Sequence, residues 1–295
     1  MRVVSRILIA ILAVAILAFG IVFLLGGRSL SRRMELPPEE FAVGTADSAR
    51  LGEGQRLATV YQCRSCHGEK LSGTSFIEGM PFMNLPAPNL TAGGIGATLT
   101  DLQWERAIRH GVGADGRSLL IMPVEAFTGL SDDDLGAIVA YLRTLPAEST
   151  ELISRSVGPA GRAAALFAPG SIMPGRLIDH AAPHPGGSAA GPGTVAHGEY
   201  LGRMCRACHG ADYGGMKLAF ADGILAPDLT ARNGAGMSAW TEEQFVAAMR
   251  QGVRPDGRAL SEVMPWRAFG QYSPEELGAL WQYLTTLPPA TSVVK

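Results

Sequence analysis

The four cysteines of this chain all lie in two copies of one five-residue pattern, in which two cysteines flank two other residues and a histidine follows. The first copy supplies Cys63, Cys66 and His67, and the second supplies Cys205, Cys208 and His209. Two thiols at this spacing can add across the two vinyl groups of a haem, and the adjacent histidine becomes an axial ligand of the iron. The pattern therefore predicts two covalently attached haem c groups.

A zinc site or a redox dithiol is the alternative for a Cys-x-x-Cys pair. Structural zinc needs four converging ligands, and it gives no reason for a histidine after the second cysteine. In both copies this histidine is followed by a glycine, Gly68 or Gly210, and no cysteine is left over. We therefore favour haem at both motifs.

The second axial position of each iron requires a thioether or another imidazole. Met122 and Met264 each lie 55 residues after the motif histidine of their half, and each precedes a proline that stiffens the loop. We expect these two methionines to be the ligands, and methionines without a counterpart in the other half to fill the core. Among the methionines without a counterpart are Met80, Met83, Met173, Met216, Met237 and Met249.

A bis-histidine site would instead use one of the remaining histidines. His110 aligns with Gln251, and the pair His180 and His184 has no counterpart in the other half. We expect these side chains, together with His197, to be solvated or hydrogen-bonded locally.

The sequence around the motifs repeats at an offset close to 142 residues. The matching segments are 87–91 with 226–230, 111–117 with 252–258, and 135–146 with 277–288. Such self-similarity indicates two duplicated domains, each built around one haem.

Each half is expected to consist mostly of helix and loop. The last helix of each half has apolar residues at i, i+3, i+4 and i+7, starting from Leu135 and from Leu277. Capping residues are expected to start the middle and last helices, because an acid or a glutamine follows each three positions later. These capping residues are Thr100, Ser131, Thr241 and Ser273. No comparable alternation of apolar residues suggests a sheet.

The N-terminal segment predicts a membrane anchor. Residues 7–25 carry no charge, and only Gly20 interrupts their aliphatic run. As a helix they would span ~28 Å, close to the ~30 Å thickness of the bilayer hydrocarbon. A cleaved signal peptide is the alternative, but its apolar region would be unusually long and no Ala-x-Ala site ends this region before Gly26. Arginines on both sides leave the orientation undecided.

Residues 148–194 differ in composition from both halves. They are rich in proline and glycine and lack helical or strand periodicity, which predicts an extended linker. Two short segments of this linker, 166–167 and 176–178, could pack on a domain surface.

Composition excludes some classes of partner. The 295 residues suggest roughly two domains, and 25 basic against 27 acidic residues give a net charge of −2. No basic footprint for nucleic acid is present. The 37 glycines and 19 prolines indicate loop-rich domains, as expected when a cofactor replaces part of the core.

With its haem motif, late Met-Pro pair and closing helix, each half resembles a class I cytochrome c domain over about residues 50–147 and 196–289. The resemblance implies an all-α fold in which the first and last helices cross closely, with Gly54 or Gly198 facing Tyr141 or Tyr283. The predicted organisation is a transmembrane anchor (1–27), a tether (28–46), a cytochrome c domain (47–147), the linker (148–194) and a second cytochrome c domain (195–290).

The same resemblance implies roles around each haem. The carbonyls of Pro88 and Pro227 would accept the Nδ1–H of the motif histidines, which raises the basicity of these ligands. Arg117 and Arg258 could pair with a haem propionate, while an ordinary exposed arginine in a turn is an equally open reading.

The whole arrangement resembles membrane-anchored dihaem cytochrome c subunits of periplasmic dehydrogenases and haem–copper oxidases. That implies a single pass through a bacterial cytoplasmic membrane, with the haem domains in the periplasm, where haem c is attached. It also implies one-electron transfer to and from redox protein partners, since His/Met ligation saturates the iron. The alternative is a dihaem enzyme, a peroxidase or a dehydrogenase of small sulfur compounds, in which the two haems would be unequal. A fixed structural subunit of a larger complex is a further alternative.

Overall fold

The computed structural model describes residues 2–184, 191–218, 221, 223–230 and 236–290. Its described residues form two compact units, each assembled from several chain segments. Unit 1 comprises residues 1–40, 66–125 and 146–182, and unit 2 comprises residues 41–65, 126–145 and 183–295. Because the units interleave along the chain, we describe each by itself, and the predicted domain boundaries stay predictions.

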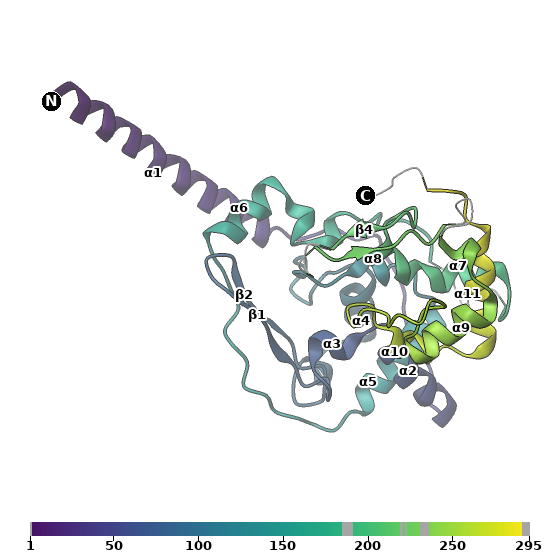
Figure 1. Cartoon of the computed structure of the whole chain (residues 1–295). Coiled ribbons are helices and arrows are strands. Elements are labelled where there is room, and N and C mark those ends of the chain that lie inside the picture. Colours follow the sequence, from purple (N-terminus) through teal and green to yellow (C-terminus); the bar gives the residue numbers. More distant parts are fainter. Residues whose placement is uncertain (1, 185–190, 219–220, 222, 231–235, 291–295) are drawn as a thin grey trace. The chain divides into compact units, whose positions relative to one another are not determined.

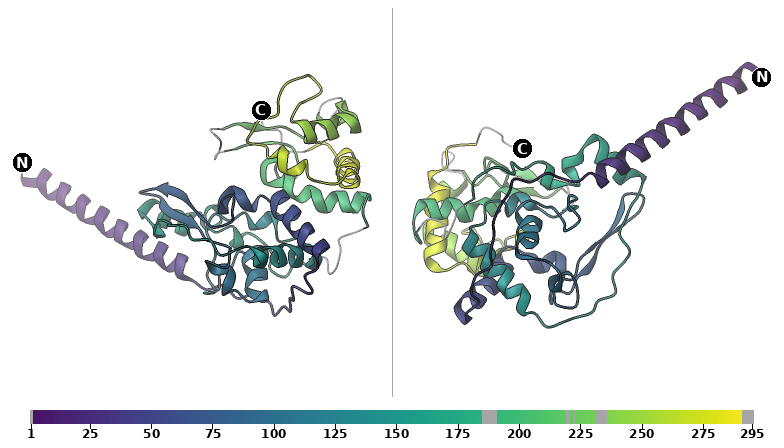
Figure 2. Two further views of the ribbon diagram at one scale, coloured as in Figure 1. Left: turned by 90° about the horizontal axis from the view of Figure 1, so that it is seen from below. Right: turned by 180° about the vertical axis from the view of Figure 1, so that it is seen from behind.

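Helix α1 (Arg2–Ser31) is the first element of unit 1 and is uninterrupted in every view (Figures 1 and 2). Its length and apolar composition suffice to cross a membrane. The helix continues past the predicted end of the anchor at residue 27, because glycines 26 and 27 are tolerated where α6 (Pro159–Phe167) packs against them. Figure 1 shows α6 beside the C-terminal end of α1.

Unit 1 also contains a three-stranded antiparallel sheet in the order β1 (Thr74–Gly79), β2 (Met83–Ala87) and β3 (Ser156–Val157). Unit 2 contains the short pair β4 (Met216–Lys217) and β5 (Leu225–Ala226). The expectation of a structure without sheets was therefore wrong, although helix predominates. Strands this short and irregular carry no run of alternating apolar residues that a sequence pattern could reveal.

Helix α4 (Asp101–Arg109) completes the regular structure that matters for the site in unit 1. Its start has the predicted capping box: the Thr100 hydroxyl accepts from the Gln103 amide, and the Gln103 side chain accepts from the Thr100 amide. The equivalent helix of unit 2, α9 (Glu242–Gln251), has the same box at Thr241 and Gln244.

The core of unit 2 contains two pairs of packed helices, α2 (Ser48–Val60) with α5 (Asp132–Thr144) and α7 (Val195–Gly202) with α11 (Pro274–Thr286). A Cβ added at Gly54 would lie 2.0 Å from the Ala137 carbonyl oxygen, and one at Gly198 would lie 1.9 Å from that of Ala279. Only glycine permits this approach, so the predicted close crossing is confirmed in both halves. The caps of α5 and α11 at Ser131 and Ser273 are also confirmed.

The predicted linker is more ordered than its composition suggested. It contains β3, the nine-residue helix α6 and two 3-10 turns, Pro169–Ser171 and Pro174–Arg176. The expectation of an extended segment was therefore wrong here. Pro159 starts α6 at its first position, where the missing N–H costs nothing, and the alanine-rich remainder favours helix. Residues 185–190 of the predicted linker lie outside the described residues.

Candidate haem sites

The two motif histidines are held in the same way. The Nδ1 atom of His67 lies 2.8 Å from the carbonyl oxygen of Pro88, and that of His209 lies 2.7 Å from the carbonyl oxygen of Pro227. A carbonyl can only accept, so Nδ1 carries the proton and Nε2 keeps the lone pair that a metal would take. Burial lowers the pKa of both imidazoles, which favours this neutral form.

Two matching backbone hydrogen bonds fix the loop that follows each histidine. The amide of Gly73 donates to the carbonyl of His67, and that of Gly215 donates to the carbonyl of His209, both at 2.9 Å. Within each loop Leu71 and Tyr213 have positive φ angles of 58° and 59°, a left-handed turn that L-residues seldom adopt. Each loop therefore folds back so that the proline carbonyl meets the imidazole.

The cysteines of each motif lie within one helical turn. Cys63 and Cys66 belong to helix α3 (Cys63–His67), and Cys208 belongs to α8 (Arg206–His209), which Cys205 directly precedes. Residues three apart share one face of a helix, so both thiols can reach the same edge of a macrocycle. All four thiols are free of disulfides. Burial, followed by the charge of Cys208, raises the pKa of Cys205 to about 12. The donor set thus fits two thioether-linked haems.

The predicted methionine ligands lie in different surroundings. Met264 is half-buried and packs against the same hydrophobic cluster as Cys205. Met122 is also half-buried and follows Ile121, whose φ of 64° places a β-branched residue in the left-handed region. Such a conformation is strained unless its surroundings impose it, and here the Ile121 amide donates to the carbonyl of Ile172 at 3.0 Å. Their ligation of iron stays a prediction.

The two predicted propionate partners lie on the surface of their turns. The Arg117 side chain is 49% exposed and lies 3.7 Å from the Asp115 carboxylate. The Arg258 side chain is 71% exposed and makes a hydrogen-bonded ion pair of 2.6 Å with Asp256. Each arginine thus already has an acidic neighbour within its own turn, and a contact with propionate stays a prediction.

One polar cluster was not anticipated. His110 was expected to be solvated or locally hydrogen-bonded, yet its side chain is only 4% exposed and two of its three partners are distant in sequence. Its Nε2 atom lies 3.0 Å from Glu39 and 3.2 Å from Glu105, and its Nδ1 atom lies 2.9 Å from His180. The mismatch of His110 with Gln251 between the halves was a sequence signal of this difference.

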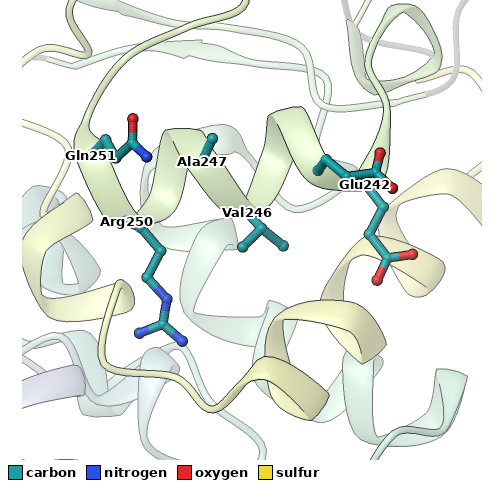
Figure 3. Close-up of a pocket in the computed structure, with 6 residues that line it drawn as sticks. Glu242, Val246, Ala247, Arg250 and Gln251 are labelled. Carbon is teal, nitrogen blue, oxygen red and sulfur yellow. The ribbon is translucent and has the colours of Figure 1, made fainter.

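A shallow hollow lies on α9 (Figure 3) and contains none of the predicted site residues. It is lined by Glu242, Glu243, Val246, Ala247, Arg250 and Gln251. The guanidinium of Arg250 donates to the carbonyls of Gly270 and Tyr272. These residues offer neither thiol nor imidazole, so the hollow is not a haem site.

Known cytochrome subunits resemble the chain. The cytochrome c subunit of a quinone-dependent alcohol dehydrogenase from Gluconobacter oxydans is 28% identical over 284 residues, which covers 82% of this chain and 56% of that protein. The gluconate 2-dehydrogenase cytochrome c subunit of Pantoea cypripedii is 27% identical, with coverages of 82% and 60%. Over a shorter stretch, the fructose dehydrogenase cytochrome subunit of Gluconobacter japonicus is 32% identical, with coverages of 43% and 27%. The chain thus spans about half the length of the first of these relatives.

The family described as cytochrome c oxidase, cbb3-type, subunit III matches residues 49–142 and again residues 194–284. Each match contains one Cys-x-x-Cys-His motif, its proline-bound histidine and its closing helix. Together the two matches cover more than half of the sequence, so the chain belongs to the cbb3-type subunit III family of cytochrome c proteins.

Proposed function

We propose that this protein is a membrane-anchored electron-transfer subunit of a periplasmic dehydrogenase complex, with two haem c groups. The observation that carries the proposal is the duplicated histidine geometry, in which Nδ1 binds a proline carbonyl and Nε2 is available for iron. Support for a dehydrogenase partner comes from the relatives, which are cytochrome subunits of alcohol and gluconate dehydrogenases.

Three kinds of side chain in each half would hold a haem. The two cysteines of each half would hold the macrocycle covalently, and the motif histidine together with Met122 or Met264 would bind the iron. A bound haem c supplies reversible one-electron oxidation and reduction of iron. Iron that is held by both of these side chains would have no free coordination site for a substrate, so this chain would carry electrons while its partner performs the chemistry.

The anchor and the boundaries belong to the same proposal. Residues 7–25 of α1 would span the cytoplasmic membrane, and cytochrome c domains at 47–147 and 195–290 would lie in the periplasm. Support for two domains comes from the two family matches, which begin at residues 49 and 194, within two residues of the predicted starts. Support for the anchor comes from the length and composition of α1.

Replacing the proposed axial methionines tests the ligand set. Met122→Ala and Met264→Ala should each remove about half of the thioether-to-iron charge-transfer absorption of the oxidised protein, because each leaves one iron without its sulfur ligand. Met216→Ala is the matched control, since this methionine has no counterpart in the other half, and it should leave the band unchanged. If both single variants keep the full band, the ligand assignment is wrong.

A further inference from the structure

Helix α6 packs against the C-terminal part of α1, over residues 23–29. The guanidinium of Arg162 lies 4.0 Å from the ring centroid of Phe23, and its Nη1 donates to the Phe23 carbonyl. A Cβ on Gly26 would lie 2.2 Å from the Arg162 carbonyl oxygen, so the two backbones touch. One turn further along, the Ser29 hydroxyl donates to the carbonyl of Ala165 at 2.6 Å.

These contacts set the direction of α6 along α1. Arg162 meets residues 23 and 26, and Ala165 meets residue 29, so the two helices run the same way. The start of α6 must therefore lie on the side of the apolar segment, and its end must lie away from it. If residues 7–25 span the membrane, the first turn of α6 lies at the edge of the hydrocarbon layer.

The turn between β1 and β2 is attached to this first turn of α6. The amide of Gly158 donates to the Phe82 carbonyl at 2.9 Å, and the amide of Ala160 donates to the Pro81 carbonyl at 3.2 Å. At the tip of this hairpin Met80 is 57% exposed, and Pro81 is exposed as well. Figure 1 shows the hairpin reaching toward α6. An apolar tip is thus held at the level of the membrane surface.

Arginines without acidic partners surround the same end of α1. Arg176 donates to the hydroxyl and the carbonyl of Ser29, at 3.0 and 2.6 Å. Burial lowers the pKa of Arg176, and the positive charge of nearby Arg32 lowers it further. Arg28 and Arg32 are exposed. Within the described part of the chain, none of these three arginines forms an ion pair, so the cluster lacks an anion.

We propose that the apolar tip at Met80 and Pro81, together with Arg28, Arg32 and Arg176, forms a binding surface for phospholipid headgroups. The proposal rests on the anchor of the proposed function. Arg28 lies about 4.5 Å beyond Leu25 along the helix axis. The headgroup layer on each side of the hydrocarbon is roughly 5–8 Å thick, so the Arg28 guanidinium would lie within it. The arginines bind lipid phosphates while the tip enters the apolar boundary. The surface would hold unit 1 at a constant height and tilt above the membrane.

Photo-crosslinking in lipid nanodiscs tests the position of the tip. The full-length protein would carry a benzophenone amino acid in place of Met80, Phe167 or Leu12, and lipid adducts would be measured by mass spectrometry. Phe167 is the matched control, because it is 73% exposed but lies at the opposite end of α6. We expect adducts at positions 12 and 80 and few at 167. Adducts at 12 without adducts at 80 would overturn the membrane surface proposal, whereas their absence at 12 would contradict the anchor itself.

Lipid retention tests the arginines separately. Native mass spectrometry of the detergent-extracted protein should show bound phosphatidylglycerol, which Arg28→Gln/Arg32→Gln reduces by about an order of magnitude. The hydrogen bonds that join α1 to α6 use Ser29 and Arg162 instead of these two side chains, so the helix pair should stay intact. Arg267→Gln, at an exposed arginine paired with Glu262 in unit 2, is the control. Equal lipid retention by the double variant and the native protein, or displacement of the lipid by inorganic phosphate, would refute binding of lipid headgroups.

Discussion

The two halves of this protein hold the motif histidine by the same backbone contacts, but they differ in the structure around these contacts. In both halves a glycine amide donates to the histidine carbonyl, and a residue with a positive φ angle turns the loop. A proline carbonyl then accepts a hydrogen bond from Nδ1 of the histidine. The first half also contains the longer β1–β2 hairpin, where the described residues of the second half form the short β4–β5 pair. The backbone turns that orient the histidine are thus the same in both halves, whereas the strands next to them differ in length.

The middle helices show the divergence most clearly. Glu105 and Arg109 of α4 and His110, which directly follows it, are buried, with Glu39 and His180 beside the imidazole. On α9, the matching positions are Val246, Arg250 and Gln251, and they line an open hollow (Figure 3). The first half has thus gained a buried ionic cluster that ties three separate chain segments together.

A second comparison concerns contacts between the halves within unit 2. Arg56 and Tyr200 follow the matched glycines Gly54 and Gly198 by two residues. Arg56 forms an ion pair of 2.7 Å with Glu276 of α11, and the Tyr200 hydroxyl donates to Asp134 of α5. Both acids lie three positions after a capping serine. In each half, the residue two positions after the matched glycine thus contacts the acid after the capping serine of the other half. Contacts of this reciprocal kind also join the subunits of a two-fold symmetric dimer.

The largest effect is expected at the helix crossings. Gly54→Ala and Gly198→Ala should each lower the free energy of unfolding by roughly 3 kcal/mol, because the new methyl group collides with a carbonyl oxygen and the helices must separate. Gly52→Ala is the control within the same helix, since a Cβ there meets nothing within 4 Å, and it should stabilise the protein slightly. Circular dichroism during chemical unfolding would measure all three. A tolerated Gly54→Ala with a damaging Gly198→Ala would break the equivalence of the halves.

An intermediate effect is expected from the contacts between the halves. Arg56→Ala leaves the carboxylate of Glu276 without its cation. Because the Glu276 side chain is only 11% exposed, the free energy of unfolding should fall by about 1–3 kcal/mol. Tyr200→Phe should cost less, because it removes one hydroxyl and leaves the ring in place. If the unfolding transition of each variant is unchanged, the paired contacts do not stabilise the fold.

The smallest effect is expected at the ionic cluster of the first half, and it depends on pH. Burial opposes the charge on His110, but Glu105 and Glu39 outweigh it and raise the pKa of the imidazole; His180 and Arg109 are its other polar neighbours. The raised pKa means that protonated His110 stabilises the fold below pH ~6.5 and that this stability is lost as pH rises through the folded-state pKa. His110→Gln, the residue that the second half carries, should destabilise by ~1 kcal/mol at pH 6 and hardly at all at pH 9.

Unfolding curves at both pH values would check this, with Gln251→His as the reciprocal variant. Gln251 lies on the open face of α9, so a histidine there should show no comparable pH dependence. An equal effect of His110→Gln at both pH values would mean that the charge on the imidazole does not matter.

The sequence was sufficient to predict the elements that depend on local chemistry. The capping boxes at Thr100 and Thr241, the glycines at the helix crossings and the proline contacts of both histidines are all present in the structure. The spacing of a hydroxyl and a glutamine identified the capping boxes, whereas the resemblance to class I cytochrome c domains identified the glycines and the prolines. Only glycine fits between two touching backbones, and a backbone carbonyl is one of the acceptors that can orient the imidazole.

The features that were missed depend on contacts distant in sequence. Helix α6 is short and would be marginal alone, and it is stabilised where Gly26 lets it pack on α1. The cluster at His110 joins Glu39 and His180, each some 70 residues away. Strands β1 to β3 pair a hairpin with a two-residue strand about 70 residues later. No local periodicity reports such pairings.

The most direct test of the central claim is the coordination state of iron in the native, membrane-extracted protein. Resonance Raman spectra combined with haem quantification should show two haem c groups per chain, both six-coordinate and low-spin in the oxidised and reduced forms. That result would agree with two saturated irons that only pass electrons. One five-coordinate haem, with peroxide turnover that disappears when the matching motif histidine is replaced, would contradict the account and identify the protein as a dihaem enzyme.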